Sequence, residues 1–110
     1  MEVKTFYCCH SSGDEIPSSD PVVFDLDTAV DVALQVLRKP GDFIGFVDSN
    51  NRVLQFRFDE SEHVWVEHPS PKDGGSFGKF VSYPEVETLI KNLPEKLHKM
   101  CLPDLEFQSW

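Results

Sequence analysis

The sequence has no hydrophobic run that approaches the ~18 consecutive apolar residues of a membrane-spanning helix. The first six residues also lack the basic segment and the following apolar run of a secretory signal. Only three cysteines occur, Cys8, Cys9 and Cys101, and an odd number cannot pair completely within one chain. Because disulfides are rare in reducing compartments, we expect a cytoplasmic protein that makes no contact with a membrane.

Spaced cysteine and histidine pairs of the kind that bind metals, such as C-x-x-C or H-x-x-x-H, are absent. Cys8, Cys9 and His10 are consecutive, and neighbouring residues of a strand point to opposite faces, so we do not expect the two thiols to share an ion. A cysteine nucleophile needs a nearby imidazole and a lowered pKa, whereas acidic surroundings raise the pKa of a thiol. We therefore predict structural thiols and no bound metal.

Recognisable catalytic and phosphate-binding patterns are scarce as well. The glycine-rich run 74–79 is followed by β-prone residues instead of a helix, which excludes a phosphate-binding loop. Glu67, His68 and Asp73 are an acid–base set only if the strand that carries them is irregular, since consecutive side chains alternate. We predict a protein that is not an enzyme, with no catalytic residue and no cofactor. The surviving enzymatic alternative is a pocket in which His68, Glu67 or Cys9 converge.

Basic residues are few: the sequence has 19 acidic and 10 basic residues, which gives a net charge of −9. No Lys or Arg occurs between Lys4 and Arg38. Such a charge repels nucleic-acid phosphates and anionic lipids and attracts basic partners, so we predict a protein partner and no direct nucleic-acid binding. The acidic residues of that stretch are Asp14, Glu15, Asp20, Asp25, Asp27 and Asp31.

Two helices are indicated by apolar periodicity and by capping residues. The first has an apolar stripe that runs from Leu26 to Leu37, with Asp25 or Asp27 as its N-cap, and ends before Pro40-Gly41. The second begins at Ser82-Tyr83-Pro84-Glu85, a capping box with proline in the first turn. The acidic side chains of the first helix are expected to face outward.

The remaining segments read as strands and turns. We predict one α+β domain over residues 1–110, an antiparallel meander of four to five strands with both helices packed on one face. Alternation of Leu54, Phe56 and Phe58 with polar residues indicates a sheet with one buried face. The expected strands cover residues 3–9, 43–47, 52–58, 63–68 and 77–81, with a loop at 10–21 and a tail at 103–110 that is either a strand or docked coil.

The middle of the chain resembles a family of small bacterial immunity proteins that guard against secreted polymorphic toxins, the Imm1-like group. The similar features are the hairpin from Gly41-Asp42-Phe43-Ile44-Gly45-Phe46-Val47-Asp48 to Arg52-Val53-Leu54-Gln55-Phe56, the strand Val64-Trp65-Val66-Glu67, the turn Gly74-Gly75, and the two helices around them. The resemblance implies an acidic inhibitor that covers the active site of a cognate toxin, often a basic nuclease.

Our functional hypothesis is therefore an acidic binding protein that neutralises a basic toxin or enzyme by occlusion. The alternative is an acidic adaptor or phage-type inhibitor that mimics nucleic acid and blocks a host enzyme. Homodimerisation is left open by the residues. Trp65 is predicted to anchor the partner, because aromatic residues carry binding energy while charges steer encounter, or else to belong to the core of a two-sided sheet. The acids predicted to contact the partner are Asp59, Glu60, Glu62 and Glu67, and a second patch is Asp25, Asp27 and Asp31.

Overall fold

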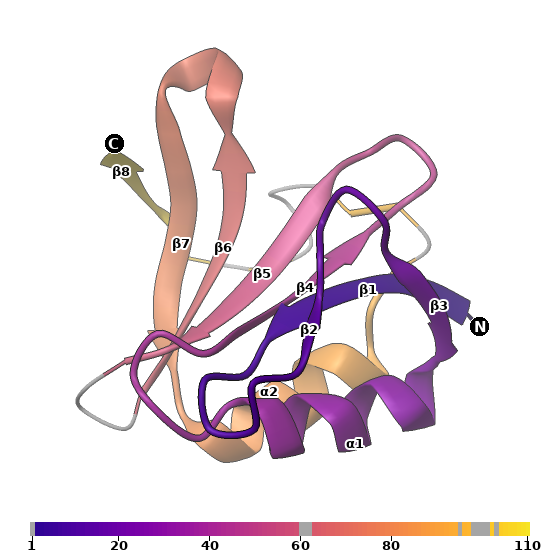
Figure 1. Cartoon of the computed structure of the whole chain (residues 1–110). Helices are drawn as coiled ribbons and strands as arrows, with labels where there is room; N and C mark the ends of the chain where they lie inside the picture. The colour runs from indigo at the N-terminus through magenta and orange to yellow at the C-terminus, as the bar shows by residue number, and fades with distance from the viewer. Residues whose placement is uncertain (1, 60–62, 95, 98–101, 103) are drawn as a thin grey trace.

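The structure, a computed structural model, describes residues 2–59, 63–94, 96–97, 102 and 104–110. In this part of the chain, eight strands form one sheet, and two α-helices, α1 (Leu26–Val36) and α2 (Tyr83–Lys91), lie on the same side of it (Figure 1). The strands are β1 (Glu2–Cys8), β2 (Glu15–Ile16), β3 (Val22–Asp25), β4 (Phe43–Val47), β5 (Val53–Phe58), β6 (Val64–Ser70), β7 (Gly75–Val81) and β8 (Glu106–Ser109). A short 3-10 helix, η1 (Pro71–Asp73), links β6 to β7.

The sheet runs in the order β2-β1-β4-β5-β6-β7-β8, with β3 also paired to β1, and every pairing is antiparallel. The predicted α+β class is confirmed. The predicted number of four to five strands was wrong, because the described residues contain three further strands at the two ends of the sheet. These are β2 and β3 at one edge and β8 at the other.

Each extra strand forms because it pairs with another strand of the sheet. The predicted loop 10–21 contains β2, where Ile16 lies opposite Tyr7. The residues expected to lead into the first helix form β3, in which Phe24 lies opposite Val3. The tail at 103–110 provides β8, in which Phe107 lies opposite Phe77. The pairings of β3 and β8 join residues far apart in the sequence, whereas β2 pairs with the nearby end of β1, and local residue preferences gave no indication of β2 or β3.

Both predicted helix starts are confirmed. The Asp25 carboxylate caps α1 by accepting the backbone N–H of Thr28 at 2.7 Å, which makes Asp25 rather than Asp27 the N-cap. At α2 the capping box forms, and the backbone N–H of Ser82 donates to Glu85 Oε1 at 3.2 Å. Asp27 and the other acids of α1 are exposed, as expected.

The core lies between the sheet and the helices. On β5, Leu54 and Phe56 are fully buried, which confirms the predicted alternation. In the core, Phe46 and Phe56 meet edge to face at 6.1 Å between ring centroids. The helices contribute apolar side chains from one stripe each, as the periodicity predicts. The buried members are Ala29, Val30, Ala33 and Val36 of α1 and Val86 and Ile90 of α2.

Two buried carboxylates hold the loops around this core. Asp42 is fully buried and accepts the backbone N–H groups of His10 at 2.7 Å, Lys39 at 2.8 Å and Arg38 at 3.2 Å. Burial alone would raise its pKa, but these donors outweigh that effect and lower the pKa below its usual value. Asp42 therefore joins the turn after β1 to the end of α1.

Asp48 acts in the same way at the β4–β5 turn. Its carboxylate accepts the N–H groups of Arg52 at 2.8 Å, Asn50 at 2.9 Å and Leu97 at 2.6 Å. The pKa is again lowered, because these donors overcome the opposing effect of burial. The bond to Leu97 ties the segment after α2 to the central hairpin.

Candidate functional site

Six exposed carboxylates lie on the part of the chain that runs from the turn after β1 to the middle of α1, and we call them the acidic surface. They lie in the turn after β1, in β2, in the loop before β3, and at the start and middle of α1. In Figure 1 these indigo and purple segments run together on the near side of the molecule. All six side chains are exposed, including the three predicted contact residues of α1. The set is Asp14, Glu15, Asp20, Asp25, Asp27 and Asp31.

The charges of the acidic surface are not neutralised internally. The salt bridge between Lys91 and Glu87 lies elsewhere, on α2, at 3.0 Å. No described Lys or Arg lies within 4.0 Å of a carboxylate of the acidic surface. Asp27 and Asp31 are spaced i, i+4 on an exposed helix face, where like charges destabilise a helix by about 0.2–0.5 kcal/mol. The negative potential of the acidic surface therefore faces solvent.

The predicted contact set of Asp59, Glu60, Glu62, Glu67 and Trp65 is only partly described. Glu60 and Glu62 lie outside the described residues. Asp59 follows β5 and is half-buried, and its backbone N–H donates to the carbonyl of His63 at 2.9 Å. Glu67 is half-buried on β6, and Trp65 is only 4% exposed. A partner would therefore meet the neighbours of Trp65 before it met the indole itself.

Trp65 and Glu67 lie on the face of the sheet opposite the helices, which we call the open face. The indole N–H of Trp65 donates to Glu67 Oε2 at 2.8 Å, and the amide of Gln55 donates to Glu67 Oε1 at 3.1 Å. The indole covers Gly78, where any Cβ would overlap it. Phe80 lies beside Trp65 at 4.9 Å between ring centroids and is 54% exposed. Phe80 thus presents an aromatic ring to solvent, although it is not among the predicted contact residues.

The part of the open face where β1 lies beside β4 is apolar. Phe6 lies across Gly45, whose missing side chain leaves room for the ring, and Phe43 approaches Phe6 at 6.3 Å between centroids. These two rings, with Val47, Val53 and Pro69 among others, line a hollow of about 460 Å³. The solvated face of an antiparallel sheet is usually polar. Gly45, between the apolar residues Ile44 and Phe46, was the available sequence signal for this packing.

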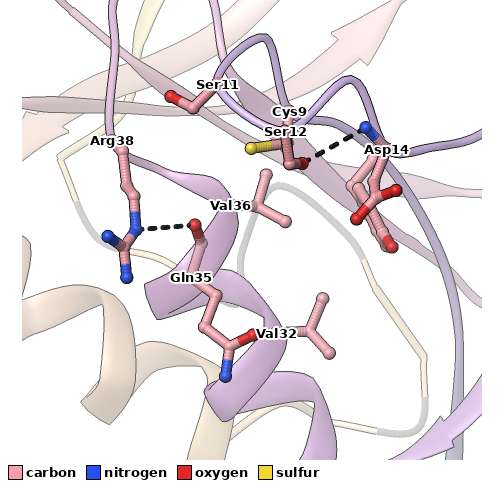
Figure 2. A pocket seen from close by; sticks show the side chains of 9 residues that line it. Cys9, Ser11, Ser12, Asp14, Val32, Gln35, Val36 and Arg38 are labelled. Atoms are coloured by element: carbon pink, nitrogen blue, oxygen red, sulfur yellow. Dashed lines mark hydrogen bonds between the residues drawn. The ribbon is translucent and has the colours of Figure 1, made fainter.

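A second hollow, of about 440 Å³, lies between the turn after β1 and α1. Figure 2 shows the Cys9 thiol beside Ser12, across from Val36 of α1. The hydroxyl and the backbone N–H of Ser12 lower the pKa of Cys9, although burial opposes them. The expectation of a raised thiol pKa is therefore wrong for Cys9. It is confirmed for Cys8, where burial and then the charge of Glu15 raise the pKa.

The predicted acid–base candidates do not converge. The Nδ1 atom of His68 lies 3.1 Å from the carbonyl oxygen of Val53, while the Glu67 carboxylate lies on the opposite face of the sheet. Asp73 accepts the hydroxyl of Ser70 at 2.8 Å. The lining of the Cys9 hollow includes no histidine among the described residues. A thiol there would therefore lack an imidazole base in the described part of the chain.

Across the described ranges, no three His, Cys, Asp or Glu side chains come together in a group that could hold a metal ion. No helix of the described chain has the length and apolar character to cross a membrane.

Comparison with protein-family models, with curated proteins and with solved structures finds no match. The resemblance to immunity proteins therefore stays a prediction.

Proposed function

We propose that this chain is an acidic binding protein of the immunity type, which neutralises a basic toxin by covering its active site. The observation that carries the proposal is the acidic surface: six exposed carboxylates without a described cation in salt-bridge range. Unneutralised charge of one sign steers a partner of opposite charge and favours it over other proteins. The choice of a toxin as partner rests on the resemblance of the central hairpin.

Asp31 argues against solubility as the whole explanation of this surface. A carboxylate in the first turn, such as Asp27, is stabilised by the positive end of the helix macrodipole. Asp31 lies one turn further along, where the macrodipole effect has fallen off, and repels Asp27. A residue that weakens the free helix is explained if its charge contacts a partner.

Removal of charge from the acidic surface tests the proposal. The triple variant Asp25→Ser, Asp27→Asn, Asp31→Asn loses three charges and keeps an N-cap at position 25. The matched control, Asp73→Asn, Asp104→Asn, Glu106→Gln, removes three charges from exposed residues near the opposite edge of the sheet. We expect the wild type and the control to capture a basic protein from the native cell. The triple variant is expected to bind that protein at least about tenfold more weakly, which corresponds to about 1.4 kcal/mol.

A survival assay gives the functional measurement. Co-expression with the adjacent open reading frames is expected to reveal one gene product that kills cells unless the wild-type chain is present. Equal binding and equal protection by the triple variant and its control would contradict the proposal. A captured enzyme that acts on nucleic acid, released by added nucleic acid, would favour the nucleic-acid mimic instead.

A single substitution separates recognition from stability. Asp31→Lys creates an i, i+4 Asp–Lys pair on α1 and is expected to stabilise the free protein by a few tenths of a kcal/mol. The same change should weaken partner binding, because it reverses one charge of the acidic surface. Urea unfolding and partner capture measure the two effects. A stabilised variant that binds as well as the wild type would assign Asp31 no role in recognition.

A further inference from the structure

The last strand of the sheet, β8, directs backbone groups into solvent. Within the described residues only β7 pairs with it, and Figure 1 shows it at the outer edge. The backbone N–H of Trp110 donates to the carbonyl of Gly74 at 2.9 Å, so Trp110 directs its backbone groups at β7. The backbone N–H and C=O groups of successive residues point to alternate sides of a strand. Gln108 therefore also directs its N–H and C=O groups at β7, while Phe107 and Ser109 direct theirs away from the sheet. These outward groups match another strand.

The two edges of the sheet differ in how they discourage such pairing. The edge formed by β2 and β3 is flanked by Pro17 and Pro21 and carries the acidic surface. Both features are common protections of an edge strand. By contrast, β8 contains no proline and has Glu106 as its one charged residue. Phe107 is 45% exposed and Trp110 is 71% exposed. The β8 edge is therefore the one suited to pairing.

We propose that two copies of this chain join through β8 in antiparallel register about a two-fold axis at Gln108. This axis pairs Phe107 with Ser109 of the second copy, and all outward N–H and C=O groups of both residues form hydrogen bonds. An axis at Phe107 would require the partner strand to extend to Leu105, which lies outside β8. The axis at Gln108 therefore uses the backbone of β8 most completely.

The side chains of β8 are compatible with this register. Gln108 of one copy lies opposite Gln108 of the second copy in a non-hydrogen-bonded pair, with the two Cβ atoms about 4.5–5.5 Å apart. A side-chain amide is both donor and acceptor, so two facing glutamines complement each other. Glu106 lies opposite Trp110 of the second copy, so the two Glu106 side chains do not face each other.

The association is expected to be weak and to strengthen with salt. A contact between four-residue strands belongs to the small interfaces, below about 1,200 Å², that are typical of transient complexes. Each copy has a net charge of −9, so the copies repel each other until added salt screens the repulsion. Binding of a basic partner to the acidic surface responds to salt in the opposite direction. The two interactions are therefore distinguishable, and this inference does not depend on the proposed function.

Charge substitutions at the symmetry axis test the register. Gln108→Lys and Gln108→Glu each place two like charges opposite one another, and each is expected to weaken self-association by up to about fivefold. A general charge effect would instead make the lysine variant associate more tightly, because it lowers the net negative charge. An equal mixture of the two variants is expected to form heterodimers at least as tight as the wild-type dimer. Sedimentation equilibrium over a range of protein concentrations, at low and high salt, measures each case.

The backbone contribution is tested at Ser109. Ser109→Pro removes the outward N–H and leaves the bonds from Gln108 to β7 in place, so it is expected to weaken association about thirtyfold through two lost hydrogen bonds. Ser109→Ala keeps the N–H and should associate as the wild type does, and unfolding midpoints verify that all variants fold. Four results would each overturn the proposal: a wild type that stays monomeric at its highest soluble concentration, a mixture no tighter than its components, equal association of the two Ser109 variants, or growth into open filaments.

Discussion

The carboxylate of Asp42 is expected to account for a large part of the stability of the fold. In Asp42→Asn, one of the two oxygens becomes an NH₂ group. Whichever way the amide is oriented, at least one of the N–H groups of His10, Arg38 and Lys39 loses its acceptor and faces a donor. Each hydrogen bond to a charged group contributes about 1.5–3 kcal/mol, so the expected loss is about 2–4 kcal/mol. For a chain of this size that lowers the midpoint of thermal unfolding by roughly 8–16 °C.

The effect should depend on pH in a defined direction. The pKa of Asp42 is lower in the folded protein than its value of about 3.9 in an unfolded chain. The stabilisation is therefore complete above the unfolded pKa and is lost as the pH falls through the folded pKa. The difference between wild type and Asp42→Asn should be full at pH 7 and should shrink below about pH 4.

Urea unfolding followed by circular dichroism, repeated from pH 7 down to the acid transition, measures both effects. Asp20→Asn is the matched control, because Asp20 is exposed and its substitution removes the same single negative charge. The control is expected to unfold within about 0.5 kcal/mol of the wild type. If Asp42→Asn behaved like this control, or if the two proteins differed equally at all pH values, the assigned role of Asp42 would be incorrect.

Two further substitutions test local features, both by urea unfolding at pH 7. Ser82→Ala removes the capping box of α2 and is expected to cost about 1 kcal/mol, and an unchanged stability would show that the cap does not matter. Gly45→Ala places a Cβ against the ring of Phe6 and is expected to cost about 1–3 kcal/mol. Much of that second cost should disappear in a Phe6→Ala background, and additive effects of the two changes would contradict the packing assigned to this pair.

Features set by neighbouring residues were predictable from the sequence. The N-cap at Asp25 and the capping box at Ser82 depend on contacts within three residues, so the residue pattern alone identifies them. The alternation of Leu54 and Phe56 was reliable for a related reason, since one buried face requires a period of two. The outward direction of the acids on α1 followed from the apolar stripe of the same helix.

Features that depend on distant pairing were not predictable in the same way. Val22 and Val23 are β-prone, but a helix begins just after them, and only their pairing with β1 makes the segment a strand. No local pattern reveals that Trp65 lies over Gly78 on the next strand, so the sequence left open whether its indole is an anchor or part of the core. Asp42 was not recognised as structural, since two of its donors come from the end of α1 and the third lies 32 residues away.

The two tryptophans occupy opposite environments, and this provides the chain with two optical reporters. Trp65 is 4% exposed and lies among Glu67, Gly78 and Phe80, whereas Trp110 is 71% exposed and donates its indole N–H to the hydroxyl of Ser76 on β7 at 3.2 Å. A dissolved quencher should therefore reach the emission of Trp110 and leave that of Trp65 almost untouched. In a variant that keeps only Trp65, the tryptophan fluorescence reports on the packing of the open face. In a variant that keeps only Trp110, it reports on changes beside β8.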